Sequence, residues 1–145
     1  MPFRFPLATV LSVRESVQRQ EELKLQKIVF EMARLNRQVN QLTADIAEAF
    51  HAEERAMRRA IPASQVQLLV WTMQAAKEKR AALELDRQTL EQQREQQLKI
   101  YHAAHRSCET LIDLRDSQRD DYEHERARTD QKRLDDMFVS RRRRA

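Results

Sequence analysis

The stretch Ala60-Ile61-Pro62-Ala63-Ser64 separates two long runs of helix-forming residues. Proline lacks an amide N–H and its ring clashes with the preceding turn, so Pro62 is unfavourable inside a helix but acceptable in a first turn. The stretch predicts that one helix ends near Ala60 and that a second begins near Ser64, with Ser64 as its N-cap. Two long helices bury their apolar stripes most simply by folding back on each other. This predicts an antiparallel hairpin with Pro62 at its tip.

The composition also favours long helices. Of the 145 residues, 34% are charged and 6% are aromatic, and there is no glycine. Such a composition is typical of coiled coils, whereas sheets and multi-element domains usually need glycine in their turns. Disorder is the competing interpretation of so polar a chain. We expect one all-α domain over residues 1–145, an antiparallel two-helix coiled-coil hairpin in which the second helix extends beyond the first.

Apolar residues in the first helix, expected over about 7–60, alternate in steps of four and three, which is the spacing of a coiled-coil seam. Its positions are Ile28, Met32, Leu35, Val39, Leu42, Ile46 and Ala49. After a turn at about 61–63, the second helix is expected over about 64–138, followed by a basic tail at 139–145. Its seam contains three arginines and runs through Leu69, Met73, Ala76, Arg80, Leu83, Arg87, Leu90 and Arg94.

Near Arg94 the apolar stripe of the second helix slips by one residue. It resumes as Leu98, Tyr101, His105, Cys108 and Ile112. A slip of this kind predicts a stutter that locally unwinds the supercoil.

The two helices differ in length. If the chain reverses at Pro62, Leu35 faces Leu90 and Leu7 faces Gln118. The first helix then has no residues left to cover the remainder of the second. We expect the second helix after about Gln118 to be unpaired and polar, with no intramolecular partner to stabilise it.

The net charge of +4 comes from the C-terminal arginines. The chain has 27 Lys and Arg and 23 Asp and Glu, so that without Arg141–Arg144 the charges balance. A cluster of arginines suits nucleic acid, anionic lipid or an acidic protein surface, and the competing interpretation is a solvated terminus. The balanced body of the chain argues against nucleic acid as a partner.

The residues give little support to catalysis or to a bound cofactor. Phosphate-binding loops need glycine, and the carboxylate pairs lie on exposed helix, so we expect no enzyme, no cofactor and no small-molecule substrate. His105, Cys108 and Glu109 share a helix face, but two of them fall on the apolar stripe and no second cluster completes a metal site. We expect no metal.

The sequence also indicates a compartment. Cys108 is the single cysteine, which excludes an internal disulfide and fits a reducing cytosol. There is no signal-peptide pattern at the start and no apolar run of about 20 residues. We expect a cytoplasmic protein.

Both ends of the chain carry more specific patterns. Residues 130–138, DQKRLDDMF, resemble the C-terminal signature of the FliJ family of bacterial flagellar export proteins, and Phe3–Leu7 with Val10–Glu15 resembles the family's opening. Ile61–Ser64 lies where the family turns between its helices. The sequence departs from the pattern at Asp136, where glutamate is commoner, and at Phe138-Val139 before the four arginines.

The resemblance implies an antiparallel coiled coil of the type III export apparatus, which serves flagellum assembly and motility. Its implied partners are the hexameric export ATPase, the cytoplasmic region of the export gate and export chaperones. It also implies a cytoplasmic protein that is peripherally associated with the inner membrane through the apparatus. The residues implied for ATPase binding are Phe3, Phe5, Leu7, Leu11, Arg14, Tyr122, Gln131, Lys132, Arg133, Leu134, Asp135 and Phe138.

Gate or chaperone contacts are implied for Trp71 and Met73. From the residues alone, Trp71 and Val70 are either exposed partner contacts or pack over the turn. Three classes of function compete: an export-apparatus coiled coil, a generic scaffold or stalk protein of virulence-type secretion, and a nucleic-acid-binding helix that uses Arg141–Arg144.

Overall fold

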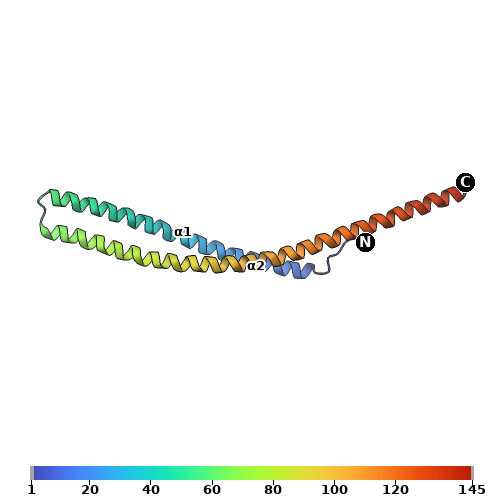
Figure 1. Cartoon of the computed structure of the whole chain (residues 1–145), viewed down its shortest axis with the longest axis horizontal. Helices are drawn as coiled ribbons and strands as arrows, with labels where there is room; N and C mark the ends of the chain where they lie inside the picture. The colour runs from blue at the N-terminus through green and yellow to red at the C-terminus, as the bar shows by residue number, and fades with distance from the viewer. Residues whose placement is uncertain (1, 145) are drawn as a thin grey trace. The chain divides into compact units, whose positions relative to one another are not determined.

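The computed structural model describes residues 2–144, which form two long helices joined by a short turn. Helix α1 spans Ala8–Arg58 and helix α2 spans Ala63–Arg144 (Figure 1). Within the described range there is no strand. The predicted all-α hairpin, in which the second helix is the longer one and packs against the first, is confirmed.

The turn contains Pro62, as predicted, and α2 begins at Ala63, next to the expected Ser64. The carbonyl oxygen of Pro62 accepts hydrogen bonds from the amides of Gln65 and Val66, at 3.0 and 3.4 Å. Pro62 therefore precedes the first helical residue, Ala63, and its fixed φ is already suited to a helix start. Ser64 lies inside the first turn, so the prediction that it is the N-cap is wrong.

The C-terminal end of α2 also differs from the expected bounds. The helix continues through Val139 and the arginines to Arg144, whereas the sequence placed its end near residue 138. Arginine is a good helix former, and its positive charge is favourable beside the partial negative charge of a helix C-terminus. The arginines are thus part of α2. Residue 145 lies outside the described residues.

The chain divides into two units, which we describe separately. Unit 2 comprises Glu22–Ile100, and unit 1 comprises Met1–Glu21 together with Tyr101–Ala145. In unit 2, α1 and α2 run side by side from the turn (Figure 1). Its most buried apolar side chains are Leu35, Val39 and Ala56 of α1.

The apolar seam between the helices of unit 2 is only partly buried. Most of its apolar side chains are only half-buried, which is what a pair of helices achieves without further layers. A fully buried aliphatic side chain contributes about 1.5–3 kcal/mol, and a half-buried one contributes less. The half-buried members are Leu25, Ile28, Met32, Leu42, Ile46 and Ala49 of α1 and Val66, Leu69, Met73, Ala76, Leu83 and Leu90 of α2.

In unit 1, the chain start and the first turns of α1 pack against α2. The residues before Ala8 are not helical, and α1 then contributes the buried Leu11. Cys108 of α2 is the most buried side chain of the described residues, at 1% exposure. Its neighbours in the α2 seam are half-buried. They are Tyr101, Ala104, Leu111, Arg115, Gln118 and Tyr122.

The predicted stutter after Arg94 is wrong. Gln97 is 9% exposed, whereas Leu98 is 37% exposed, so the seam continues through the polar residue. From Gln97 the steps of four and three lead on to Tyr101, Ala104 and Cys108 without a break. The sequence alone suggested a slip because a glutamine occupies a position that coiled coils usually fill with an apolar side chain.

Candidate functional site

The N-terminal segment, residues 2–7, lies along α2 within unit 1. Phe3 and Phe5 are half-buried, and the ring of Phe3 lies 5.7 Å from that of Tyr122 at an interplanar angle of 44°. The segment joins α1 through a hydrogen bond from the Ala8 amide to the Phe5 carbonyl, at 3.2 Å. The chain start therefore packs against α2 as far as Tyr122. The sequence had placed the end of this packing at about Gln118.

The residues implied for ATPase binding near the chain start have different environments. Leu11 is buried in unit 1 together with the half-buried Phe3 and Phe5, so these side chains hold the unit together. Leu7 and Arg14 are exposed.

A polar cluster joins the two helices of unit 1. The Nε2 of Gln18 lies 3.0 Å from Nδ1 of His105, and Nε2 of His105 lies 3.3 Å from Oε1 of Glu109. The ring of Tyr101 stacks on His105, with centroids 6.0 Å apart. The ring nitrogens of His105 thus have protein partners. In residues 2–144 no group of three His, Cys, Asp or Glu side chains is placed to hold a metal ion.

The thiol of Cys108 lies beside this cluster. Burial raises its pKa above the ordinary value of 9.0, and the carboxylate of Glu15 raises it further, while the guanidinium of Arg14 opposes both. The thiol therefore stays protonated near neutral pH, which suits a small apolar side chain of the seam rather than a nucleophile.

Residues 123–144 of α2, here called the terminal segment, have no partner helix among the described residues. Every side chain in the segment is exposed. It holds the second group of residues implied for ATPase binding, which the structure does not bring together with the first group at the chain start. The members are Gln131, Lys132, Arg133, Leu134, Asp135 and Phe138.

The sequence explains why pairing stops at Tyr122. If the seam is continued in its steps of three and four, the next positions are Glu125, Thr129, Lys132, Asp136 and Val139. Only the last of these side chains is apolar, so a helix packed in the same register would gain little from burial and would have to desolvate charges. The Thr129 hydroxyl instead donates a hydrogen bond to the Glu125 carbonyl of its own helix, at 3.0 Å.

Three large apolar side chains of the terminal segment lie on another face. Leu134, Met137 and Phe138, here called the apolar patch, are 61%, 56% and 68% exposed. They are spaced i, i+3 and i+4, and therefore share one side of the helix. Together with Asp135 and Arg141 they line a shallow hollow. Met137 lies within the signature DQKRLDDMF but was not among the residues implied for ATPase binding, although its spacing from Leu134 places it on the same face.

In unit 2, the residues implied for gate or chaperone contacts lie near the turn. Trp71 is 63% exposed, so it does not pack over the turn, while Val70 is half-buried. Met73 occupies a half-buried seam position. Other large apolar side chains near the turn are also exposed and were not singled out from the sequence. They are Phe50, Met57 and Leu68.

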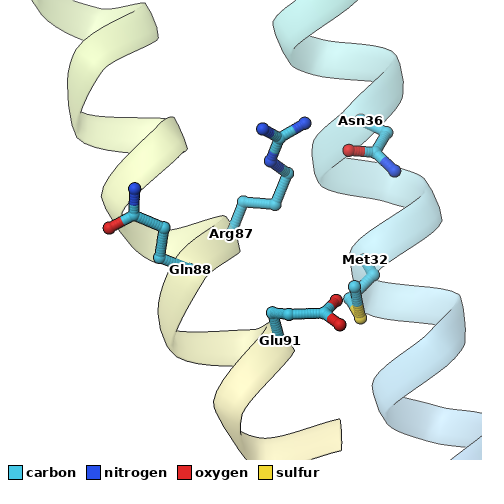
Figure 2. A pocket seen from close by; sticks show the side chains of 5 residues that line it. All are labelled: Met32, Asn36, Arg87, Gln88 and Glu91. Carbon is cyan, nitrogen blue, oxygen red and sulfur yellow. The ribbon is translucent and has the colours of Figure 1, made fainter.

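A shallow groove of about 350 Å³ lies between the helices in the middle of unit 2. Figure 2 shows Met32 and Asn36 of α1 facing Arg87 and Glu91 of α2 across it. The groove lies where the seam of α2 has an arginine instead of an apolar residue. Arg87 extends its aliphatic stem there and pairs with Glu84 of its own helix at 2.7 Å. These features describe an open gap in the seam.

Within residues 2–144, neither helix carries an apolar stretch of membrane-spanning length. Comparison with protein families gives a match to the model described as flagellar FliJ protein, over residues 3–145. The comparisons with curated proteins and with solved structures gave no match. The family match covers nearly the whole chain and includes both end patterns that carry the resemblance. The chain therefore belongs to the FliJ family of flagellar proteins.

Proposed function

We propose that this protein acts in the flagellar type III export apparatus as a coiled coil that inserts its terminal segment into the ring of the export ATPase. Family membership supports a role as a component of flagellar protein export. The proposal adds the export ATPase as the direct partner.

The observation that carries the proposal is the helical terminal segment without a partner in the described chain. Isolated helices are marginal in water unless tertiary packing stabilises them. The side chains of this segment are all exposed and its seam positions up to Asp136 are polar, so it gains no such packing from α1. A ring that surrounds the segment supplies the missing contacts. Gln131, Lys132, Arg133, Leu134, Asp135 and Phe138 then meet the ATPase directly.

The chain start has a supporting role in this proposal. Phe3, Phe5, Leu11 and Tyr122 pack within unit 1 and hold the base of the terminal segment. Leu7 and Arg14 are exposed, with Arg14 further from that base, near Cys108, and both contact the rim of the ring.

For the export gate and the export chaperones, we propose binding through unit 2 near the turn. Trp71 supplies the exposed aromatic surface, since large exposed aromatic side chains commonly act as anchors in protein interfaces. Met73 contributes from the seam below it. The protein hydrolyses nothing itself. It works in the cytoplasm and meets the inner membrane only through the apparatus.

Binding experiments with two variants test the proposal. One variant ends after Tyr122, and the other is Trp71→Ala in the full chain. The purified export ATPase and the purified cytoplasmic region of the gate serve as the two binding partners. The truncated variant should lose ATPase binding and keep gate binding, and Trp71→Ala should do the reverse. ATPase binding that survives the truncation contradicts the assignment of the terminal segment.

A further inference from the structure

The apolar patch and Arg141 form one face of the terminal segment. Leu134, Met137 and Phe138 are spaced i, i+3 and i+4, and Arg141 follows Leu134 at i+7. Helices that dock in a groove of another protein present anchors with this spacing. The same side chains line one shallow hollow with Asp135. The face thus has three apolar anchors and a cation at its C-terminal edge.

The patch faces away from the seam of the hairpin. Lys132 and Asp136 continue the seam, and Leu134 lies two residues from each, which is about 200° around the helix at about 100° per residue. A helix that extended the hairpin in register would therefore cover Lys132 and Asp136 and leave Leu134 in water. The patch needs an occupant that approaches from the other side.

The charges around the patch indicate the chemistry of that occupant. Arg141 borders the patch, and Arg142, Arg143 and Arg144 follow it, all of them helical and exposed. Four consecutive residues of a helix point in four directions, so the cations surround the helix end. Apolar anchors beside such a cluster complement a groove whose floor is apolar and whose rim carries carboxylates.

A membrane surface fits the same face less well. Interfacial helices usually present a long apolar face with basic residues along its borders. Here the apolar patch covers only Leu134–Phe138. Asp135 also lines the hollow, and its carboxylate accepts a hydrogen bond from Nε2 of Gln131 at 3.1 Å. An anionic lipid surface would repel that carboxylate, whereas a protein groove can leave it at a solvated edge.

We infer that the terminal segment docks by one face, with Leu134, Met137 and Phe138 in an apolar groove and Arg141 against a carboxylate at the groove's acidic rim. The inference rests on the proposed function, because it takes the groove to belong to the export ATPase. The contact is then one-sided. Within a ring, a single subunit holds the patch at a time, while Lys132 and the other polar residues of the helix face the surrounding subunits.

Matched variants of the full chain test the inference. Leu134→Gln and Phe138→Gln remove apolar anchors, and Val139→Gln is the control, because Val139 is an exposed apolar residue on another side of the same segment. Glutamine is a good helix former, so the helix is retained. Arg141→Gln is likewise compared with Arg142→Gln. The measurement is the affinity for the purified export ATPase, with vesicles of phosphatidylethanolamine and phosphatidylglycerol as a second probe.

The expected result is a loss of about tenfold in ATPase affinity for each of Leu134→Gln and Phe138→Gln, and near-native affinity for Val139→Gln. Arg141→Gln should weaken binding more than Arg142→Gln, most clearly at low salt. Equal losses for patch and control variants overturn one-sided docking. Native affinity for all the point variants, together with loss of binding on truncation after Tyr122, also overturns one-sided docking. That result leaves the proposed function intact. Loss of vesicle binding alone assigns the patch to lipid and also overturns the inference.

Discussion

The rings of Phe3 and Tyr122, which are far apart in the sequence, lie 5.7 Å apart where the chain start packs against α2. Before this contact α2 has a partner in the chain, and after it every described side chain of α2 is exposed. The position of this aromatic pair therefore defines where the paired part of unit 1 ends and the terminal segment begins.

Phe3→Ala should loosen the chain start without unfolding the hairpin. An aromatic pair contributes about 0.5–1.5 kcal/mol beyond the area that it buries, and Phe3 is only half-buried. Hydrogen exchange should become faster at the amides of Ala8 and Leu11, which bond to the carbonyls of Phe5 and Leu7. Phe30→Ala is the control because Phe30 is exposed, and it should leave these amides unchanged. Equal exchange in the two variants would show that Phe3 does not hold the segment.

An aspartate scan at two adjacent positions tests the register of α2. Gln97→Asp places a carboxylate at a buried position, and Leu98→Asp places it at a more exposed one. Burying a charge is costly, so Gln97→Asp should lower the free energy of unfolding by about 1–3 kcal/mol more than Leu98→Asp. Urea denaturation followed by circular dichroism gives both values. A larger loss for Leu98→Asp would restore the stutter that the sequence suggested.

The hairpin itself followed from the sequence because its determinants are local. Pro62 and the unbroken heptads from Ile28 to Ala49 each predict one feature, and both features are present. The register after Arg94 was mispredicted because Gln97, although polar, occupies a seam position where its neighbours bury it. That effect belongs to packing between helices and has no signature in the residue itself.

The terminal segment was predicted only in part. Because the first helix is the shorter one, the sequence predicted an unpaired end of α2. Phe3 and Phe5 lengthen the paired part in a non-helical conformation, which heptad spacing does not describe. The apolar patch was overlooked as a unit because Leu134, Met137 and Phe138 lie off the seam. Their spacing already places them on one face of the expected helix, and the continuation of α2 to Arg144 adds Arg141 to that face.

The reactivity of Cys108 should report on the integrity of unit 1. Its thiol is buried and its pKa is raised, so alkylation of the native protein should be slow at neutral pH and fast after unfolding. Glu15→Gln removes a carboxylate that disfavours the thiolate, so the pKa should fall and alkylation should become faster. Arg14→Gln should act in the opposite direction.

The raised pKa of Cys108 also has a consequence for stability. A thiol whose pKa is higher in the folded state stabilises the fold as long as it is protonated in both states. That contribution is lost as the pH rises above the ordinary value of 9.0. Cys108→Ala should therefore flatten the decline of the free energy of unfolding above this pH, which denaturation at a series of pH values measures. An unchanged slope would contradict the raised pKa.

Replacing Arg141–Arg144 by glutamine should barely affect stability. The four side chains are exposed, and surface substitutions of this kind usually change the free energy of unfolding by less than about 0.5 kcal/mol each. Thermal denaturation checks this expectation. A melting temperature lower by several degrees would show that the arginines contact the rest of unit 1.

The most direct test of the central claim is the ATP turnover of the purified export ATPase with the full chain and with a variant that ends after Tyr122. The variant keeps the Phe3–Tyr122 contact and all the buried side chains, so its circular dichroism per residue and its melting temperature should match those of the full chain. The full chain should stimulate ATP turnover, and the folded variant should not. Equal stimulation by the two proteins would contradict the assignment of ATPase binding to the terminal segment.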